Sequence, residues 1–287
     1  MLEVINRMTK KSKIRKLRTK TESRTSGIII KLLLLFLVGW LVIHQEVIEN
    51  FIKNYYEQYN LLVHGRINYC SESVEYHDII PIIRSQILHQ DEALNRIETS
   101  LRNHIQFTPI AIIGTTGVGK TLFSNLLMKF FPWRENVQRF SWAVFADEKE
   151  KFLMVKKLLR RLSNCGHNLV VIDDFTLKDA AYVRNINKEA VRLEKSLILL
   201  YIFNIPSFPE RAENGYKRVS EQLENLEGIQ TIPFRSFDQS HLTGCIKYEA
   251  ELLNVSLNAE NILQIQNTIE ATRSGCKKVY AKVAVFS

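Results

Sequence analysis

Apolar runs separated by helix-length stretches organise most of the chain. Such runs predict strands at 110–113, 138–145, 169–172, 197–203 and 229–233. Between them, apolar residues recur at helical spacing over 149–163 and 177–193. Alternating strands and helices with short connections are typical of an α/β fold, in which a parallel sheet carries helices on both faces. Residues 236–287 show helical periodicity alone and predict a small second domain.

The N-terminal part of the chain has a different pattern. Residues 27–43 are apolar throughout except for Lys31, and as a helix they would span about 26 Å, close to the thin end of bilayer thickness. Lys31 lies one turn from the start, where its side chain can reach the interface. No small-x-small cleavage site follows the run. We therefore expect an uncleaved transmembrane signal anchor over 27–44, rather than a cleaved signal peptide or a buried core helix.

The charge is concentrated before this anchor. The 287-residue chain has a net charge of +9, of which residues 1–26 carry +7. The rest is nearly neutral, which disfavours a nucleic-acid-binding domain, whose positive charge would lie on the fold. By the positive-inside rule the tail faces the cytosol or nucleoplasm, and everything after residue 44 faces a lumen. The tail could instead be a nuclear localisation patch or bind acidic lipids.

A glycine-rich segment follows the first apolar run. Residues 114–121 fit the pattern G-x-x-x-x-G-K-[ST], and residues 122–130 continue as a helix with one apolar face. Glycines let backbone N–H groups point inward at phosphate oxygens, and the helix N-terminus adds its dipole. The expected nucleotide site comprises Gly114, Thr115, Thr116, Gly117, Val118, Gly119, Lys120 and Thr121. Lys120 would reach the β- and γ-phosphates and the Thr121 hydroxyl would bind Mg²⁺; an ordinary glycine-rich turn explains neither residue.

Two acidic residues end the run at 169–172. Asp173 and Asp174 follow a predicted buried strand, at the carboxyl edge where α/β sheets bind ligands. A phosphate-binding loop needs a carboxylate on the neighbouring strand to hold the metal through water, and Asp173 is the candidate. Asp174 stands where hydrolytic machines usually keep a Glu that orients the attacking water; the alternative for it is a helix cap. Asp is one methylene shorter than Glu, which disfavours hydrolysis.

Asn204 ends the run at 197–203. A polar residue there can contact the γ-phosphate or its water, although a lone Asn in such a place is more often a turn residue. A GTPase would need a guanine-reading Asn-Lys-x-Asp, and the nearest string, at 187–190, ends in Ala. The GTPase class is therefore disfavoured.

Several separated pieces now line up with one group of proteins. Residues 87–94, Ile-Leu-His-Gln-Asp-Glu-Ala-Leu, resemble the motif before the first strand of AAA+ ATPases, with His89 where a Gly is usual. The glycine-rich loop, the Asp173-Asp174 strand and Asn204 follow in the AAA+ order of Walker A, Walker B and sensor 1. The tail Gly275-Cys276-Lys277 resembles the sensor 2 of the torsin family, and it disfavours a small-molecule kinase. The resemblance covers about residues 80–287, whereas 205–240 match poorly.

The torsin resemblance implies roles for individual residues. Lys120 and Thr121 would bind ATP and Mg²⁺, Asp173 the metal, and Asn204 would act as sensor. Lys277 would touch the γ-phosphate. In torsins an upstream lid cysteine pairs with that of sensor 2, so Cys245 and Cys276 would form a redox-sensitive disulfide; the alternative is two buried structural thiols. Cys70 and Cys165 have no expected role.

The resemblance also implies where the chain works and with what. Torsins are ATPases of the endoplasmic reticulum lumen and nuclear envelope, which agrees with the orientation expected from charge. They lack an arginine finger of their own, and membrane-anchored partners with luminal AAA+-like domains supply one. The expected partners are therefore such an activator in a homo- or hetero-oligomer, protein clients, and the membrane through 27–44, with no nucleic acid. The alternative is a scaffold or regulatory subunit that binds ATP and hardly hydrolyses it, which Asp174 favours.

The expected organisation follows from these pieces. It comprises a basic tail (1–26), a transmembrane signal anchor (27–44), a helical linker (45–80), an AAA+ nucleotide-binding domain (81–233) and a helical lid with sensor 2 (234–287). Asn254 begins the sequon Asn254-Val255-Ser256, a candidate glycosylation site in a lumen, although it falls in a predicted helical stretch.

Overall fold

A computed structural model describes most of the chain after the N-terminal region. The described residues are 31, 33–36, 40, 45–64, 69–70, 76–206, 209–224 and 228–286. The basic tail and 12 of the 18 residues of the expected anchor at 27–44 lie outside them. Among the described residues, no helix combines the length and apolar character needed to cross a membrane. The chain divides into two compact units, residues 1–69 and 70–287.

The first unit contributes one long described helix, α2 (Gln45–His64), which forms most of the expected helical linker. Its apolar side chains Phe51, Tyr55 and Leu62 are exposed. In the second unit, a short 3-10 turn at Tyr76–Asp78 leads into α3 (Ile79–Arg84), whose Ile80 and Ile83 are fully buried.

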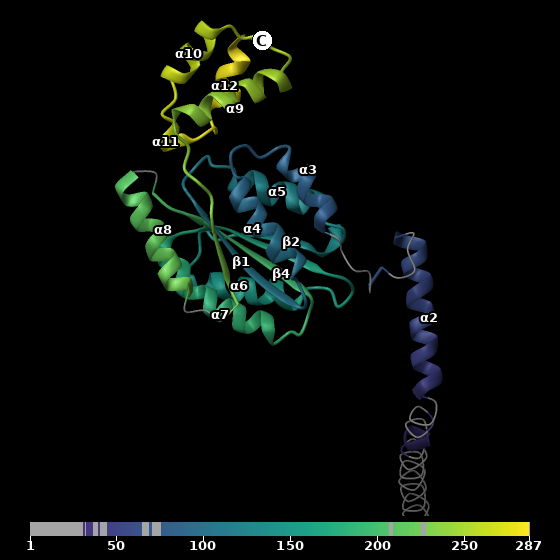
Figure 1. Ribbon diagram of the computed structural model, residues 1–287. Coiled ribbons are helices and arrows are strands. Elements are labelled where there is room, and N and C mark those ends of the chain that lie inside the picture. The colour runs from purple at the N-terminus through teal and green to yellow at the C-terminus, as the bar shows by residue number, and fades with distance from the viewer. Residues whose placement is uncertain are drawn as a thin grey trace, which may run out of the picture. The chain divides into compact units, whose positions relative to one another are not determined.

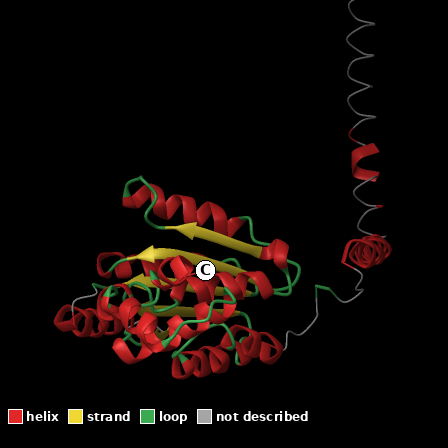
Figure 2. Cartoon of the chain, turned by 90° about the horizontal axis from the view of Figure 1, so that it is seen from above, coloured by secondary structure: helices red, strands yellow, loops and turns green. Residues whose placement is uncertain are grey.

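The second unit is built on a five-stranded parallel sheet with helices on both faces, as the pattern of apolar runs predicts (Figures 1 and 2). The strands are β1 (Phe107–Gly114), β2 (Val137–Ser141), β3 (Asn168–Phe175), β4 (Leu197–Asn204) and β5 (Gln230–Pro233). Their order in the sheet is β2-β3-β4-β1-β5, and every neighbouring pair is parallel. All five predicted strands are confirmed, with changed bounds.

Two strand bounds differ for physical reasons. The strand expected over 138–145 ends at Ser141, because the Trp142 side chain turns into the core and its indole N–H donates to buried Asp179 (2.8 Å). The first strand begins at Phe107, so Pro109 lies inside it rather than at its start. Pairing with β5 begins only at Ile110, so the missing N–H of Pro109 leaves no bond unmade on that side.

Helices cover both faces of the sheet. They are α4 (Asp91–Arg102), α5 (Lys120–Phe130), α6 (Glu148–Arg160), α7 (Ala180–Val191) and α8 (Pro209–Glu224). The larger core cluster joins α6, α7 and α8 to one face, through residues such as Val155, Val183 and Val219 packed against Tyr201 and Phe203. Helices α4 and α5 contact β1, and α5 also contacts β3. Side chains of each strand alternate between the two faces, so both are buried.

The C-terminal residues are helical, as the periodicity over 236–287 predicts, and we call this segment the lid. It comprises α9 (Gln239–Leu252), α10 (Ala259–Asn267), α11 (Ala271–Ser274), α12 (Val279–Val283) and a 3-10 turn at Ala284–Phe286. Leu242, Ile246 and Val279 form part of its separate core. Asp238 caps α9, since its carboxylate accepts the backbone N–H groups of Ser240 (2.8 Å) and His241 (3.1 Å).

A disulfide joins Cys70 to Cys165, in the loop between α6 and β3, with a Cα–Cα distance of 4.4 Å. The backbone N–H of Gly166 donates to the carbonyl of Cys70 (3.2 Å). Gly166 has a φ of +71°, and a Cβ there would lie 2.2 Å from the Trp133 indole. Position 166 therefore favours glycine for both its backbone conformation and its close contact with Trp133. The bond thus ties the start of the second unit to the amino end of β3.

Candidate functional site

The glycine-rich loop has the shape that its pattern predicts. It turns from the end of β1 into the start of α5, with Gly117 at φ +81° and Gly119 at φ +97°, a region that side chains with a Cβ rarely adopt. Lys120 is the first residue of α5 and is buried. Its ammonium donates to the carbonyl oxygens of Gly114 (2.8 Å) and Thr115 (2.6 Å), so the loop holds the lysine at its own centre.

Burial changes the acid–base character of Lys120. Desolvation lowers its pKa to about 8, against the opposing influence of Asp173 and Asp174. A phosphate group placed near this ammonium would restore the charged form, because opposite charge raises the pKa of a lysine. An anionic ligand at the loop would therefore stabilise the charged form of Lys120.

The two carboxylates after β3 differ in their surroundings. Asp173 is buried: its Oδ2 accepts from Nη2 of Arg139 (2.6 Å) and its Oδ1 from the backbone N–H of Asp174 (2.8 Å). Asp174 is half-buried, with a φ of +65°, and its Oδ2 accepts from the Ser141 hydroxyl (2.7 Å). Both carboxylates are thus bonded to side chains of β2. Neither the Arg139 nor the Ser141 contact could be found from a motif.

The expectation that this carboxylate strand lies next to the glycine-rich loop strand is wrong. Strand β4 lies between β1 and β3, and Asn204 at its end is in register with Gly114. The residue beside the loop is therefore the half-buried Asn204, and Asp173 is one strand further away. Because β3 and β4 are parallel, their terminal residues Asp173, Asp174 and Asn204 lie at the same carboxyl edge of the sheet.

The lid contacts the loop through two glycines. The backbone N–H of Cys276 donates to the carbonyl of Gly117 (3.2 Å). A Cβ on Gly117 would lie 1.9 Å from the carbonyl oxygen of Ser274, and one on Gly275 would lie 2.4 Å from that of Gly117. Gly275 has a φ of +52°, which also favours glycine. The two backbones therefore pack at a distance that no other residue type permits.

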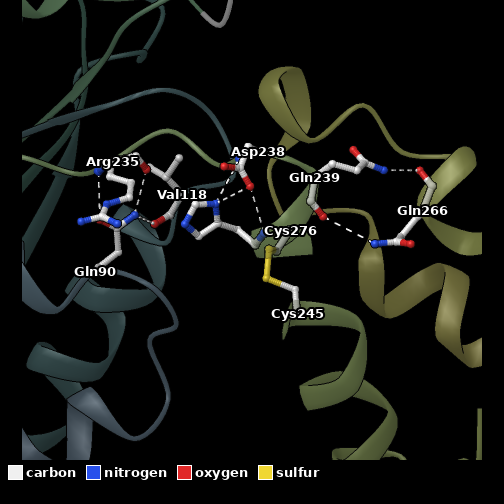
Figure 3. Close-up of a disulfide and its surroundings, with 9 residues drawn as sticks. Gln90, Val118, Arg235, Asp238, Gln239, Cys245, Gln266 and Cys276 are labelled. Atoms are coloured by element: carbon white, nitrogen blue, oxygen red, sulfur yellow. Dashed lines mark hydrogen bonds and ion pairs between the residues drawn. A yellow bond between two sulfur atoms is a disulfide. The ribbon is translucent and has the colours of Figure 1, made fainter. Parts of the chain in front are cut away.

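Cys245 and Cys276 form the second disulfide, within the lid, with a Cα–Cα distance of 6.0 Å (Figure 3). Cys245 lies on α9, and Cys276 adjoins the glycine contact with the loop. The pairing implied by the torsin resemblance is thus present. Lys277, the next residue, is exposed.

One cavity, of about 570 Å³, brings these pieces together. The predicted site residues that line it are Thr116, Gly117, Val118, Gly119, Lys120, Thr121, Asp174, Asn204, Cys245, Cys276 and Lys277. Ile87, Leu88 and Phe237 add an apolar part. Gly114, Thr115 and Asp173 lie outside its lining. The cavity thus combines the glycine-rich loop and two lysines with apolar side chains, which suits a nucleotide, and its lining also includes the acidic residues Asp174 and Glu249.

The residues present fit a nucleotide better than they fit a metal ion. Thr121 is exposed at the cavity, as a ligand of Mg²⁺ would have to be. Asp173 does not line it, and both of its carboxylate oxygens already accept hydrogen bonds. Of the two expected metal ligands, Thr121 is in place and Asp173 is paired with Arg139.

The junction between sheet and lid contains two residues whose contacts were not expected. Gln90 is buried and bridges two segments: its amide donates to the carbonyls of Val118 (3.2 Å) and Arg235 (2.9 Å) and accepts the N–H of Arg235 (2.9 Å) (Figure 3). His89 has a φ of +59°, and its ring lies edge-on to Phe237. Burial, with His241 as a lesser influence, lowers the pKa of His89. Both residues lie in the 87–94 segment, and the resemblance of that segment to the AAA+ motif is the sequence feature that could have pointed to them.

The sequon residue Asn254 does not line the cavity, and its position differs from expectation. It lies in a turn just after α9, exposed and with a φ of +53°, rather than within a helix. An exposed turn is where an acceptor asparagine can be reached.

Comparison of the chain with models of known protein families gives no match, and comparison with curated protein sequences gives none either. The class of this domain is therefore described from its fold and from the geometry of the site alone. The second unit is an α/β domain with a five-stranded parallel sheet, helices on both faces and a phosphate-binding-loop type of strand-to-helix turn.

Proposed function

We propose that this chain is a torsin-like AAA+ ATPase that uses ATP binding to remodel protein or membrane assemblies. The observation that carries the proposal is the single cavity lined by the glycine-rich loop, Asn204, Lys277 and the Cys245–Cys276 disulfide. These groups come from parts of the chain more than 150 residues apart, in the order that the torsin resemblance implies. An ordinary glycine-rich turn would have no reason to meet a lysine and a disulfide of a separate lid.

The fold supports the AAA+ part of the proposal. Strand β4 stands between the loop strand and the acidic strand, which leaves Asn204 beside the loop, where a sensor of the γ-phosphate would stand. The small helical lid contacts the loop directly through Gly117 and Gly275. A nucleotide bound between them would contact both domains, so its state can set the position of the lid.

ATP would be held mainly by the backbone N–H groups of the loop and by Lys120. Those N–H groups and the N-terminus of α5 favour an anion. Lys120 would exchange the carbonyls of Gly114 and Thr115 for phosphate oxygens, and Lys277 would approach the terminal phosphate from the lid. Mg²⁺, when bound, would neutralise part of the phosphate charge, with Thr121 as the residue placed to contact it.

The Cys245–Cys276 bond supports the torsin part. Both sulfur-bearing residues line the cavity, and Cys276 also donates its backbone N–H to the loop. Reduction would release α9 from the segment that touches the loop. The redox state of the compartment would thereby change nucleotide affinity.

The proposed location is the lumen of the endoplasmic reticulum or nuclear envelope. Two disulfides in one chain are typical of an oxidising compartment. Residues 27–44 would anchor the chain with its N-terminus in the cytosol or nucleoplasm. A membrane-anchored partner with a luminal AAA+-like domain would supply the arginine that stabilises the transferring phosphoryl group, and protein clients would be remodelled.

A second candidate, an ATP-binding scaffold or regulatory subunit with little hydrolysis, is favoured by Asp174. Its carboxylate is short, its backbone is left-handed, and its Oδ2 accepts a hydrogen bond from Ser141. A general base that orients water should have an oxygen directed at that water. Asp174→Glu separates the candidates: a large gain in ATP turnover with an activating partner would indicate that the native protein is hydrolysis-impaired.

ATP binding by the full-length chain, purified in mild detergent, is the primary test. We expect ATP and ADP to bind the oxidised protein, and we expect ATP affinity to change on reduction and to become insensitive to redox state in Cys276→Ser. Absence of binding to either nucleotide in both redox states would overturn the proposal.

A further inference from the structure

The carboxylate of Asp173 already has a cationic partner. Its side chain is 4% exposed, and the guanidinium of Arg139 lies 2.6 Å from its Oδ2. The remaining oxygen accepts the backbone N–H of Asp174 at 2.8 Å. Each oxygen through which this carboxylate would hold a metal, directly or through water, therefore already accepts one hydrogen bond, and one of the two donors is a cation.

Arg139 is held in this position from two elements. Its Nη2 donates to Asp173 on β3, and its Nη1 donates to Oδ1 of Asn125 on α5 (3.0 Å). The planar guanidinium can make both bonds at once, which a lysine ammonium on a flexible chain does less well. The arginine side chain is 41% exposed, so it lies between the buried carboxylate and solvent.

Electrostatics makes this pair an alternative to a metal. A buried carboxylate is stable only when it is paired and hydrogen-bonded, and Arg139 satisfies that requirement without any ion. The Lys120 ammonium is a second positive charge near this carboxylate, close enough for Asp173 and Asp174 to raise its pKa. A divalent cation brought to Asp173 would be repelled by the guanidinium that is bonded to this carboxylate and, more weakly, by the Lys120 ammonium.

We propose that Arg139 takes the place of the divalent cation on Asp173, so that nucleotide binds this chain with an affinity nearly independent of Mg²⁺. The proposal rests on the nucleotide-binding function proposed above and deepens it. Magnesium would then reach the site through the phosphates and Thr121, without Asp173. Arg139 is a positioning residue in this scheme, because it acts through Asp173.

The first test compares ATP affinity in Mg²⁺ with that in excess EDTA, using the full-length chain in detergent. For the native protein we expect the two dissociation constants to agree within about threefold. In Arg139→Gln, Asp173 loses its counter-ion and becomes available to the metal, and Mg²⁺ should then tighten ATP binding by about tenfold or more. A native protein that already needs Mg²⁺ at this level, or a variant with an unchanged ratio, would overturn the inference.

The second test omits nucleotide, so it separates failure of this inference from failure of the proposed function. Mg²⁺ alone should leave the Tm of the native protein unchanged and raise that of Arg139→Gln by about 2–4 °C, because a metal then binds the unpaired carboxylate. Equal responses of the two proteins to Mg²⁺ would contradict the counter-ion role, whether or not ATP binds.

Two further variants serve as controls. Arg139→Gln combined with Asp173→Asn removes both charges, and it should lose the response to Mg²⁺ that the single variant gains. Arg184→Gln removes an exposed arginine from α7 and should behave as the native protein does. If Arg139→Gln alone fails to fold while the double variant folds, an unpaired Asp173 is the cause; a double variant that still responds to Mg²⁺ would place the metal elsewhere and overturn the inference.

Discussion

At the scale of a single residue, Lys120 would make the proposed nucleotide binding depend on pH. Its pKa in the folded protein is about 8, lowered by burial, and bound phosphates would raise it. Binding therefore favours the protonated lysine. We predict that ATP affinity is constant below this pKa and weakens above it by up to about tenfold per pH unit, until the pKa of the complex is reached.

The measurement is the dissociation constant of ATP between neutral and alkaline pH. Lys120→Arg provides the matched control, because a guanidinium stays charged throughout this range and its variant should show a flat profile. A native profile as flat as that of the arginine variant would mean that Lys120 does not titrate on binding. The stability of the unliganded protein should show a complementary effect. The pKa of Lys120 is about 8 in the folded protein and higher in the unfolded chain, so the free energy of unfolding should increase as pH rises from about 8 toward the pKa of the unfolded chain.

The sequence predicts site residues where spacing alone determines position. Lys120 and Thr121 follow from the loop pattern, and Asn204 from its place after an apolar run. The Arg139–Asp173 pair could not be predicted, because Ser141 is the residue in register with Asp173 and Arg139 reaches it diagonally from two positions earlier. Such a contact depends on strand pairing and side-chain length, which a single sequence does not encode as a pattern.

The contact between the lid segment and the loop gives a prediction at the scale of elements. In Gly275→Ala the added Cβ would lie 2.4 Å from the carbonyl oxygen of Gly117, so the two backbones must separate. We predict about tenfold weaker ATP binding and faster tryptic cleavage near Lys277, measured by titration and limited proteolysis.

Gly228→Ala is the matched control for this variant. Gly228 has a comparable left-handed φ of +78°, but no atom lies within 4 Å of a Cβ placed there. It therefore imposes the same kind of backbone strain without the clash. Equal effects of the two substitutions on ATP affinity would assign the result to strain and not to the contact between lid and loop.

Element order along the chain could be predicted, but element order across the sheet could not. The apolar runs locate all five strands, since buried parallel strands are continuous apolar segments. Nothing in those runs specifies that β4 inserts between β1 and β3, because that depends on the crossover of each helix in space. The end of β2 was missed for a local reason: Trp142 continues the apolar pattern but leaves the strand to reach Asp179.

Asn254 tests the orientation of the whole molecule. Oligosaccharide is attached only on the luminal side, and the asparagine lies in an exposed turn after α9. We predict that the chain expressed in cells carries one glycan that an endoglycosidase removes and that Asn254→Gln abolishes. A sequon moved into the tail at 1–26 should remain unmodified; modification there instead would reverse the proposed topology.

The two disulfides act on the whole chain in different ways. Cys70 and Cys165 are 95 residues apart, against 31 for Cys245 and Cys276, so the first closes the larger loop. The chain-entropy treatment gives stabilities of about 4.7 and about 3.7 kcal/mol for loops of these sizes. Only the cysteines of the second bond line the candidate cavity. The first disulfide should therefore affect mainly the stability of the fold, whereas the second should also affect ligand affinity.

We predict that replacing Cys70 and Cys165 by Ser lowers the free energy of unfolding by about 2–5 kcal/mol and leaves the ATP affinity of the folded protein unchanged. Replacing Cys245 and Cys276 should cost less stability and change ATP affinity, because α9 then loses its covalent link to the segment that touches the loop. Denaturant unfolding and ATP titration of the two double variants measure both quantities. An ATP affinity that depends on Cys70 and Cys165 would show that the amino end of β3, and not the lid alone, governs the nucleotide site.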